Sequence, residues 1–190
     1  MIIKPILFST LMVRAILNGR KTVTRRVIQG NIVYKCDIDH DGTLLDYEDC
    51  YGDFIAPEKL CRYQPGDILY VRESFGQIAR HIFWYKATPP KGCENLLWKP
   101  SIFMPKEAAR IWLKVTDVRS DRLQNMARID FLNEGLRLPE DEQHVDLLLK
   151  AEFKGLWNST VKKQDLGKYG WDANPYVWVI DFEQCKKSEI

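Results

Sequence analysis

The sequence predicts an α+β fold in which a small mixed β-barrel of short strands is flanked by two or three helices; a layered α/β sandwich is the alternative. Two observations favour the barrel. The apolar segments are short and combine β-type alternation with helical spacing. They also lack the regular strand–helix–strand order that a parallel sheet requires. With 190 residues, 45% of them hydrophobic, the chain is long enough for one packed domain. We assign residues 1–185 to that domain and 186–190 to a frayed tail.

The first elements follow from local patterns. Residues 2–9 are an apolar strand. Apolar residues at i, i+3 and i+4 predict a helix over 11–17, which Thr10 caps and Gly19 ends. Residues 22–28 are β-branched and alternate, so they predict a strand that begins within a cluster of basic residues.

Residues 29–63 differ in composition, since they are rich in Gly, Asp and Tyr and contain the turn signal His40-Asp41-Gly42. We interpret them as a polar hairpin insertion that decorates the core. Cys36, Cys50 and Cys61 lie there with His40, but no CxxC or HxxxH pair is present, so no metal site is predicted. The absence of GxGxxG and Walker sequences likewise predicts no dinucleotide or NTP cofactor.

The remaining elements follow a tight turn at Gln64-Pro65-Gly66-Asp67. Strands are predicted at 68–75, 83–87, 110–118 and 176–182, and helices at 130–136 and 142–157. The longer helix is amphipathic. We expect its inward face to carry Leu147, Leu148, Ala151 and Leu156.

Charge and cysteine content restrict the function classes. The formal net charge of +2 excludes a polycationic nucleic-acid coat, so affinity for anions has to come from local clusters. Five cysteines without a paired motif indicate a reducing compartment. No apolar run reaches membrane length, and the N-terminus lacks the long apolar core of a signal peptide. We therefore expect a cytoplasmic protein without a membrane partner.

The basic cluster contains a lysine three residues before a threonine. Lys21 and Thr24 stand among Arg20, Arg25 and Arg26. An amine beside a hydroxyl can act as a base for a nucleophile, and arginines suit a phosphate or a nucleotide. In a continuous strand the two side chains would face opposite ways, so they can meet only if Lys21 lies in the turn before the strand. The alternative is an exposed basic strand start with a solvated lysine.

Several motifs together resemble the ASCH family, which belongs to the PUA-like superfamily of RNA-associated β-barrels. They are Pro5-Ile6-Leu7-Phe8, the GRKTVTR segment at 19–25, the PGDILYVRE segment at 65–73, Glu134-Gly135, and Trp178-Val179-Ile180-Asp181-Phe182. The resemblance covers nearly the whole chain apart from 29–63 and the tail. The Trp98-Lys99-Pro100-Ser101 segment and the turn from Trp171 to Pro175 are similar to longer versions carried by bacteriophages and prophages.

The resemblance implies an activity and a site. One branch of the family consists of small bacterial amidohydrolases that deacetylate N(4)-acetylcytidine with a lysine, a threonine and a glutamate. These correspond here to Lys21, Thr24 and Glu134, and Glu73 is a second candidate for the carboxylate. Residues 130–135 match the family only in the acidic start and the Glu-Gly end, and this chain is longer than those enzymes. A non-catalytic RNA-binding module and a ribonuclease are the alternatives, so the expected partner is a nucleoside or single-stranded RNA.

Further residues are candidates for substrate or RNA contacts. Arg72 and Glu73 are expected either to form a structural ion pair or to line the cavity. Lys99, Ser101 and Arg110 are candidates for contacts to phosphate or sugar. Among the tryptophans, Trp171, in a turn beside Asn174, is the candidate for stacking on a base, whereas Trp178 alternates within an apolar strand and is expected in the core.

Overall fold

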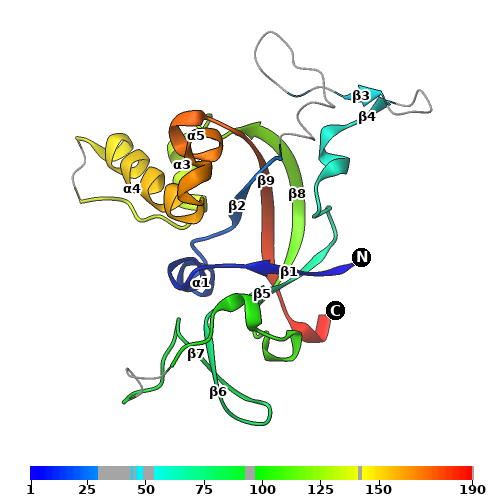
Figure 1. Ribbon diagram of the computed structural model, residues 1–190, viewed down its shortest axis with the longest axis vertical. Helices are drawn as coiled ribbons and strands as arrows, with labels where there is room; N and C mark the ends of the chain where they lie inside the picture. The colour runs from blue at the N-terminus through cyan, green and yellow to red at the C-terminus, as the bar shows by residue number, and fades with distance from the viewer. Residues whose placement is uncertain (30–43, 45, 49–53, 93–96, 141–142, 190) are drawn as a thin grey trace.

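In the computed structural model, the described residues are 1–29, 44, 46–48, 54–92, 97–140 and 143–189. Their centre is a five-stranded mixed sheet in the order β1–β5–β8–β9–β2 (Figure 1). The strands are β1 (Ile3–Leu7), β2 (Val23–Val27), β5 (Ile68–Arg72), β8 (Trp112–Arg122) and β9 (Tyr176–Cys185). β1 pairs in parallel with β5, and the other neighbours are antiparallel. The predicted α+β class is confirmed.

The two edge strands of this sheet, β1 and β2, are not paired with each other in the described part of the chain. A side chain connects them instead, because Arg26 Nη2 in β2 donates to the carbonyl oxygen of Leu7 in β1 at 2.8 Å. The sheet therefore curves around a core as a barrel wall does, with its ladder open between β1 and β2.

In the described part of the chain, four helices accompany the sheet: α1 (Thr10–Leu17), α3 (Arg128–Asn133), α4 (Val145–Thr160) and α5 (Leu166–Tyr169). α1 connects β1 to β2, while α3, α4 and α5 lie together on one side of the sheet (Figure 1). Ser9, not Thr10, is the N-cap of α1, since its hydroxyl accepts from the backbone N–H of Met12 at 3.4 Å. No helix in the described part of the chain has the length and apolar character needed to cross a membrane.

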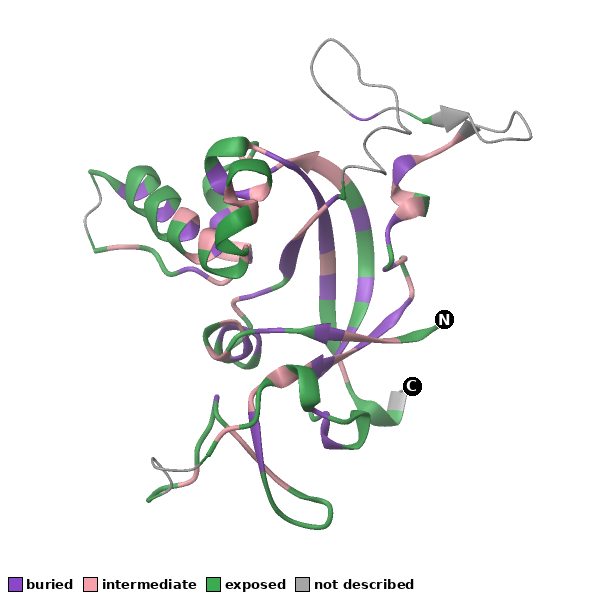
Figure 2. Cartoon of the chain, viewed as in Figure 1, coloured by how far each residue is buried: buried purple, intermediate pink, exposed green. Residues whose placement is uncertain are grey.

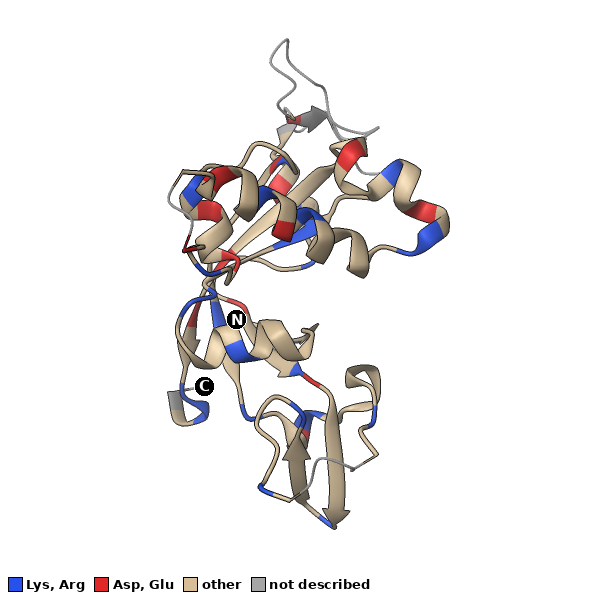
Figure 3. Ribbon diagram, turned by 90° about the vertical axis from the view of Figure 1, so that its left-hand side faces the viewer, with Lys and Arg blue, Asp and Glu red and all other residues tan. Residues whose placement is uncertain are grey.

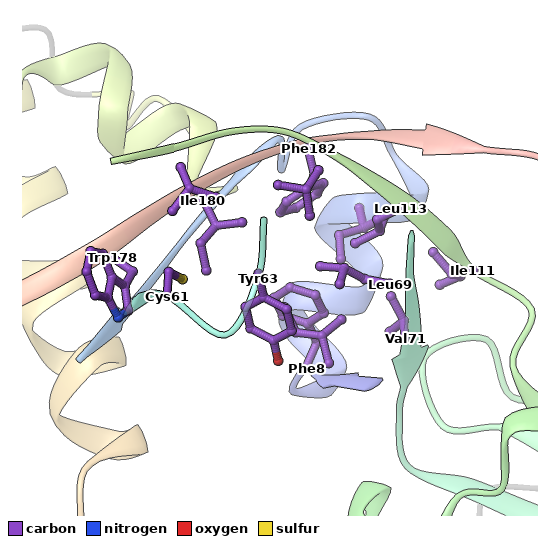
Figure 4. Close-up of a cluster of buried hydrophobic side chains, with 14 of the residues drawn as sticks. Phe8, Cys61, Tyr63, Leu69, Val71, Ile111, Leu113, Trp178, Ile180 and Phe182 are labelled. Atoms are coloured by element: carbon purple, nitrogen blue, oxygen red, sulfur yellow. The ribbon is translucent and has the colours of Figure 1, made fainter. Parts of the chain in front are cut away.

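Strand β9 is buried on both faces and organises the core (Figure 2). Trp178, Ile180 and Phe182 point into a cluster with the side chains of β1, β5 and α1 (Figure 4). Val177 and Val179 point the other way, into a second cluster formed with α3 and α4. This arrangement explains why the sequence of β9 is almost continuously apolar, as expected for a strand covered on both sides.

The inward face of α4 differs from the predicted one. Val145, Leu149, Phe153 and Trp157 are buried, whereas Leu147 is 65% exposed and Leu148 is 40% exposed. Ala151 is also exposed, and Leu156 is half-buried. The buried residues recur every fourth position, and two of them are large aromatics that fill the second cluster. The aliphatic stripe that the sequence favoured therefore lies toward α1 and solvent.

The described part of the predicted insertion contributes side chains to the hydrophobic core. A short antiparallel pair, β3 (Tyr47–Glu48) with β4 (Phe54–Ile55), fits the expected hairpin. However, Leu44, Cys61 and Tyr63 are buried in the first core cluster (Figure 4). The turn predicted at 40–42, together with Cys36 and Cys50, lies outside the described residues.

A second hairpin extends from the end of β5. It consists of β6 (Phe75–Ala79) and β7 (Ile82–Tyr85). The predicted strand 68–75 is thus divided between β5 and β6, and 83–87 corresponds to β7. Short 3-10 turns complete the structure at 57–60, 101–103, 106–108, 163–165, 171–173 and 187–189, the last of them in the predicted tail.

Candidate functional site

Lys21 lies in the turn between α1 and β2. Gly19 ends α1 with a φ of +69°, a conformation that glycine adopts without a steric cost, and its N–H donates to Ile16. The backbone then doubles back, so that the N–H of Lys21 donates to the carbonyl of Ala15 at 3.2 Å. Lys21 also forms an isolated β-bridge with Glu134. The lysine therefore precedes the strand, as a meeting with Thr24 would require.

Glu134 reaches Lys21 because α3 ends in contact with α1. The residue after it, Gly135, has a φ of +103°. A Cβ atom at Gly135 would lie 2.7 Å from the Cβ of Ala15 and 3.2 Å from the Cβ of Lys21. Only glycine permits this approach, which places the carboxylate of Glu134 against the amine of Lys21.

The amine of Lys21 has three acceptors. Its Nζ lies 2.5 Å from Glu134 Oε2, 2.7 Å from the carbonyl of Val23 and 3.0 Å from the carbonyl of Glu134. The Lys21 side chain is 0% exposed and that of Glu134 is 4% exposed. The alternative of a solvated lysine is therefore wrong. A buried charge of this kind requires a partner, and Glu134 provides it.

Arg25 completes the buried network. Its Nη1 donates to Glu134 Oε1 at 3.2 Å and its Nη2 donates to Asp130 Oδ1 at 2.9 Å. Its Nε is buried and has no hydrogen-bond partner among the described residues. Asp130 and Glu134 are four residues apart and meet the same guanidinium from α3 and its end. The role of Asp130 was not predicted, although its spacing of four residues from Glu134 was a usable signal, since such residues share one side of a helix.

The electrostatic state of Lys21 results from opposing effects. Burial lowers the pKa of the Lys21 amine from its ordinary value of 10.5, the charge of Glu134 raises it, and the charges of Arg26 and Arg25 lower it again; the pKa is lowered overall. At a given pH, the neutral form of the Lys21 amine is therefore more populated than the neutral form of a surface lysine. This is the property that a base requires.

A cavity of 340 Å³ lies next to this network. Thr24, Arg26 and Glu134 line it, whereas Lys21 does not and is covered by Glu134. No hydrogen bond between the Thr24 hydroxyl and the Lys21 amine is recorded in the described part of the chain. The other lining residues are Leu7, Phe8, Ser9, Met12, Arg25, Ser74, Ser101, Phe153, Leu156, Trp157 and Thr160.

Arg26 connects this cavity to a second hollow. Its guanidinium lies 5.3 Å from the centroid of the Phe8 ring. The second hollow measures 300 Å³, and both Arg25 and Arg26 line it together with Lys162 and Tyr169. Burial lowers the pKa of Arg26, against the opposing charges of Tyr63 and Glu134. Phe8 and Ser74 were not predicted as site residues, although both stand within or beside the motifs that carried the family resemblance.

The remaining predicted contacts are distributed around the site. Ser101 lines the cavity. Arg20 donates to the carbonyl of Gly135 and lines a different groove beside α1. Arg72 donates to the carbonyl of Ile102, and its Nε is buried without a partner among the described residues. Lys99 is exposed and pairs through its backbone with Phe75.

Glu73 forms an ion pair with Arg110, so the predicted ion pair with Arg72 is wrong. Its two carboxylate oxygens accept from Arg110 Nε at 2.8 Å and from Arg110 Nη2 at 3.0 Å. The same guanidinium stacks on Tyr85 at 3.9 Å and donates to Thr88 at 2.8 Å. These contacts fix the β6–β7 hairpin. Of the two candidate carboxylates, Glu134 is the one that contacts Lys21 in this structure.

The predicted stacking residue Trp171 is wrong for that role. It is 3% exposed and packs edge-on against Phe153 in the second core cluster, so its faces are covered. Asn174 stabilises the turn before β9, where its φ is +45° and its side-chain oxygen accepts from the N–H of Gln124 at 2.8 Å. Trp178 lies in the core, as predicted.

No protein-family model matches the sequence, and no curated protein matches it. Among solved structures, the chain is similar to an ASCH domain from Lactobacillus crispatus JV V101, with 12% identity and a TM-score of 0.44 over 96% of this chain and 79% of that chain. Because both the identity and the TM-score are low, this similarity carries no functional argument.

Proposed function

We propose that the cavity at Thr24 and Glu134 is the active site of an amidohydrolase that removes the acetyl group from N(4)-acetylcytidine. The observation that carries the proposal is the position of Glu134, which lines the cavity and whose carboxylate holds the buried amine of Lys21. The substrate class comes from the motif resemblance. The cavity volume of 340 Å³ suits a nucleoside, since small-molecule sites measure roughly 300–1,000 Å³.

The reaction proceeds through an ester on Thr24. The Thr24 hydroxyl attacks the acetyl carbonyl carbon, and the bond from that carbon to the N4 atom of cytosine breaks. The proton that Thr24 loses is returned to the leaving nitrogen, which yields cytidine. Water then hydrolyses the ester to acetate and restores the hydroxyl. The guanidinium of Arg26, which lines the same cavity, stabilises the negative charge that develops on the carbonyl oxygen.

Lys21 acts through Glu134. A threonine hydroxyl needs a base, and a lysine serves only in its neutral form, which burial favours here. Because Lys21 does not line the cavity, the proton travels through the Glu134 carboxylate, which reaches both the cavity and the amine. This assignment gives each of the three residues a distinct task.

The test is acetate release from N(4)-acetylcytidine by the wild type and matched variants. Lys21→Arg keeps the cation but cannot supply a neutral base, so we expect a loss of about 10²–10⁴-fold in kcat. Thr24→Val removes the hydroxyl and should abolish turnover. Thr160→Val is the control, since Thr160 lines the same cavity but its hydroxyl donates to the carbonyl of Trp157 at 2.7 Å. Full activity in both Lys21→Arg and Thr24→Val would refute the proposal, as would a wild type that releases no acetate.

The pH dependence tests the role of Lys21 separately. The base must be deprotonated, so the rate should rise with pH and level off at a pH below 10.5, because the pKa of Lys21 is lowered from that value. Residual activity of Lys21→Arg should lack this rise. A wild-type rate that falls across the same range would exclude Lys21 as the base.

A second candidate function is RNA binding without turnover. It is favoured by the hollow that adjoins the cavity, where Arg26, Lys162 and Tyr169 offer cations and an aromatic ring for a strand running past the site. Fluorescence anisotropy with a single-stranded RNA should then show affinity that falls with salt and weakens in Arg26→Gln and Lys162→Gln. Absence of binding at low salt would exclude this function, and a denaturing gel of the incubated RNA would distinguish binding from cleavage.

A further inference from the structure

A groove of 770 Å³ separates α1 from α4 and is larger than the proposed active-site cavity. Its walls are mostly apolar, with Met12 and Ala15 on α1, Ala151 and Leu156 on α4, and Leu136 between the two helices. Met12, Glu134 and Leu156 line both hollows, so the groove adjoins the cavity.

The groove presents apolar side chains to solvent. Leu11 is 66% exposed and Leu17 is 38% exposed, and both line it from α1. On the opposite wall, a Cβ atom at Gly155 would have no atom within 4 Å. A glycine inside a helix costs about 1 kcal/mol relative to alanine, and no close packing within the chain requires it here. Gly155 therefore keeps open a space that a longer side chain would fill.

Three arginines border the groove without a carboxylate partner. Arg14 Nε donates to the carbonyl of Ala87 at 2.9 Å, Arg20 donates to the carbonyl of Gly135, and Arg137 is exposed. Among the described residues none of the three forms an ion pair, whereas Arg119 and Arg128 each bind an aspartate. Figure 3 shows that basic and acidic positions are otherwise interspersed over the helical part of the chain.

The charge of the groove is therefore positive. Among the described residues that line it, two are acidic, Glu134 and Glu152. The carboxylate of Glu134 is already bound by Lys21 and Arg25, which leaves Glu152 against three arginines. Exposed cations beside an apolar wall attract a ligand that is both apolar and anionic.

We propose that this groove binds a small amphipathic anion of the fatty-carboxylate class. The apolar chain lies between α1 and α4, above Gly155, and the carboxylate is held by Arg14, Arg20 and Arg137. The volume suits a ligand of this size. The described residues that line the groove include no aromatic ring for stacking a base, so the groove differs in kind from the cavity at Thr24.

The probes are decanoate and decyltrimethylammonium, which share an apolar chain and carry opposite charges. Isothermal titration calorimetry below their micelle concentrations should show saturable binding of decanoate. The cation should bind at least about tenfold more weakly, because the hydrogen bonds of a carboxylate to arginine are lost. Equal affinity for the two probes would overturn the assignment of an anion site.

Two sets of variants locate the binding. Gly155→Leu fills the open space and should lower decanoate affinity by at least about tenfold, since the chain loses its apolar contacts. Gly167→Leu is its matched control, because Gly167 is a helical glycine of α5 that also has no atom within 4 Å of a Cβ and does not line the groove. Unchanged affinity in Gly155→Leu would overturn the proposal.

The double variant Arg14→Gln, Arg137→Gln tests the carboxylate contact. It should lower the affinity for decanoate by about tenfold or more, and the weak affinity for decyltrimethylammonium should stay unchanged or rise. Arg80→Gln, at an exposed position of the β6–β7 turn, is the control for a general loss of positive charge. An equal loss in Arg80→Gln would mean that net charge, not the groove, attracts the anion. Circular dichroism of each variant confirms that it is folded.

Discussion

Lys21 and Glu134 illustrate how a buried ionic network depends on each of its members. Two cationic side chains, Lys21 and Arg25, meet the single carboxylate of Glu134, and all three are almost completely buried. A charge transferred from water to such an environment is costly unless it is paired. The carboxylate is therefore important to stability as well as to the proposed reaction.

Removal of this carboxylate should destabilise the protein strongly. Glu134→Ala leaves the charge of Lys21 without its partner, and we expect the free energy of unfolding in urea to fall by about 3–5 kcal/mol. Asp172→Ala is the control, because it breaks an exposed ion pair in which Lys154 Nζ lies 2.8 Å from Asp172 Oδ1. Its loss should lower the free energy of unfolding by about 0–1 kcal/mol. Equal losses in the two variants would contradict the view that the network is desolvated.

At the scale of elements, the end of α3 is positioned by contact with α1 and the turn that follows it. Gly135 has no space for a Cβ, whereas Gly19, which also has a positive φ, has open space around it. Two glycines thus serve different purposes in the same region. One is required by its backbone conformation alone, and the other by both conformation and close packing.

Alanine substitutions should separate these two requirements. Gly19→Ala imposes only backbone strain and should cost about 1–2 kcal/mol. Gly135→Ala adds overpacking against Ala15 and Lys21, so its loss should be larger by roughly 1–3 kcal/mol. Thermal unfolding measures both. If the two variants lost the same stability, α3 and α1 would have room to move apart, and Glu134 would not be held in place by Gly135.

At the scale of the whole molecule, β9 joins two hydrophobic clusters. Ile180 belongs to the cluster inside the curved sheet, and Phe153 belongs to the cluster under α4. Alternate residues of the same strand contribute to both. Because the strand cannot leave one cluster without disrupting the other, we expect the two to unfold together, as the prediction of a single domain over 1–185 implies.

Cooperative unfolding can be tested with one substitution in each cluster. Phe153→Ala should lower the free energy of unfolding by about 3–5 kcal/mol and Ile180→Val by about 0.5–1.5 kcal/mol. In each variant, circular dichroism and tryptophan fluorescence should report one shared urea midpoint. Two separated midpoints in Phe153→Ala would show that the helical cluster unfolds by itself.

Local patterns in the sequence determined much of this protein. The β-branched residues of β2 and the nearly continuous apolar run of β9 each predict a strand, and the helical spacing in α1 predicts a helix with one buried side. The basic cluster also indicated where charged side chains would gather. These features required no knowledge of distant contacts.

Only the tertiary structure decided which side chains meet. The predicted inward face of α4 consisted of three leucines and Ala151, yet Phe153 and Trp157 fill the space beneath the helix. The pairing of Lys21 with Glu134 depends on a contact between residues far apart in the chain, which Gly135 permits. Period and composition constrain an element by itself, whereas burial, and with it the pKa of Lys21, is a property of the assembled fold.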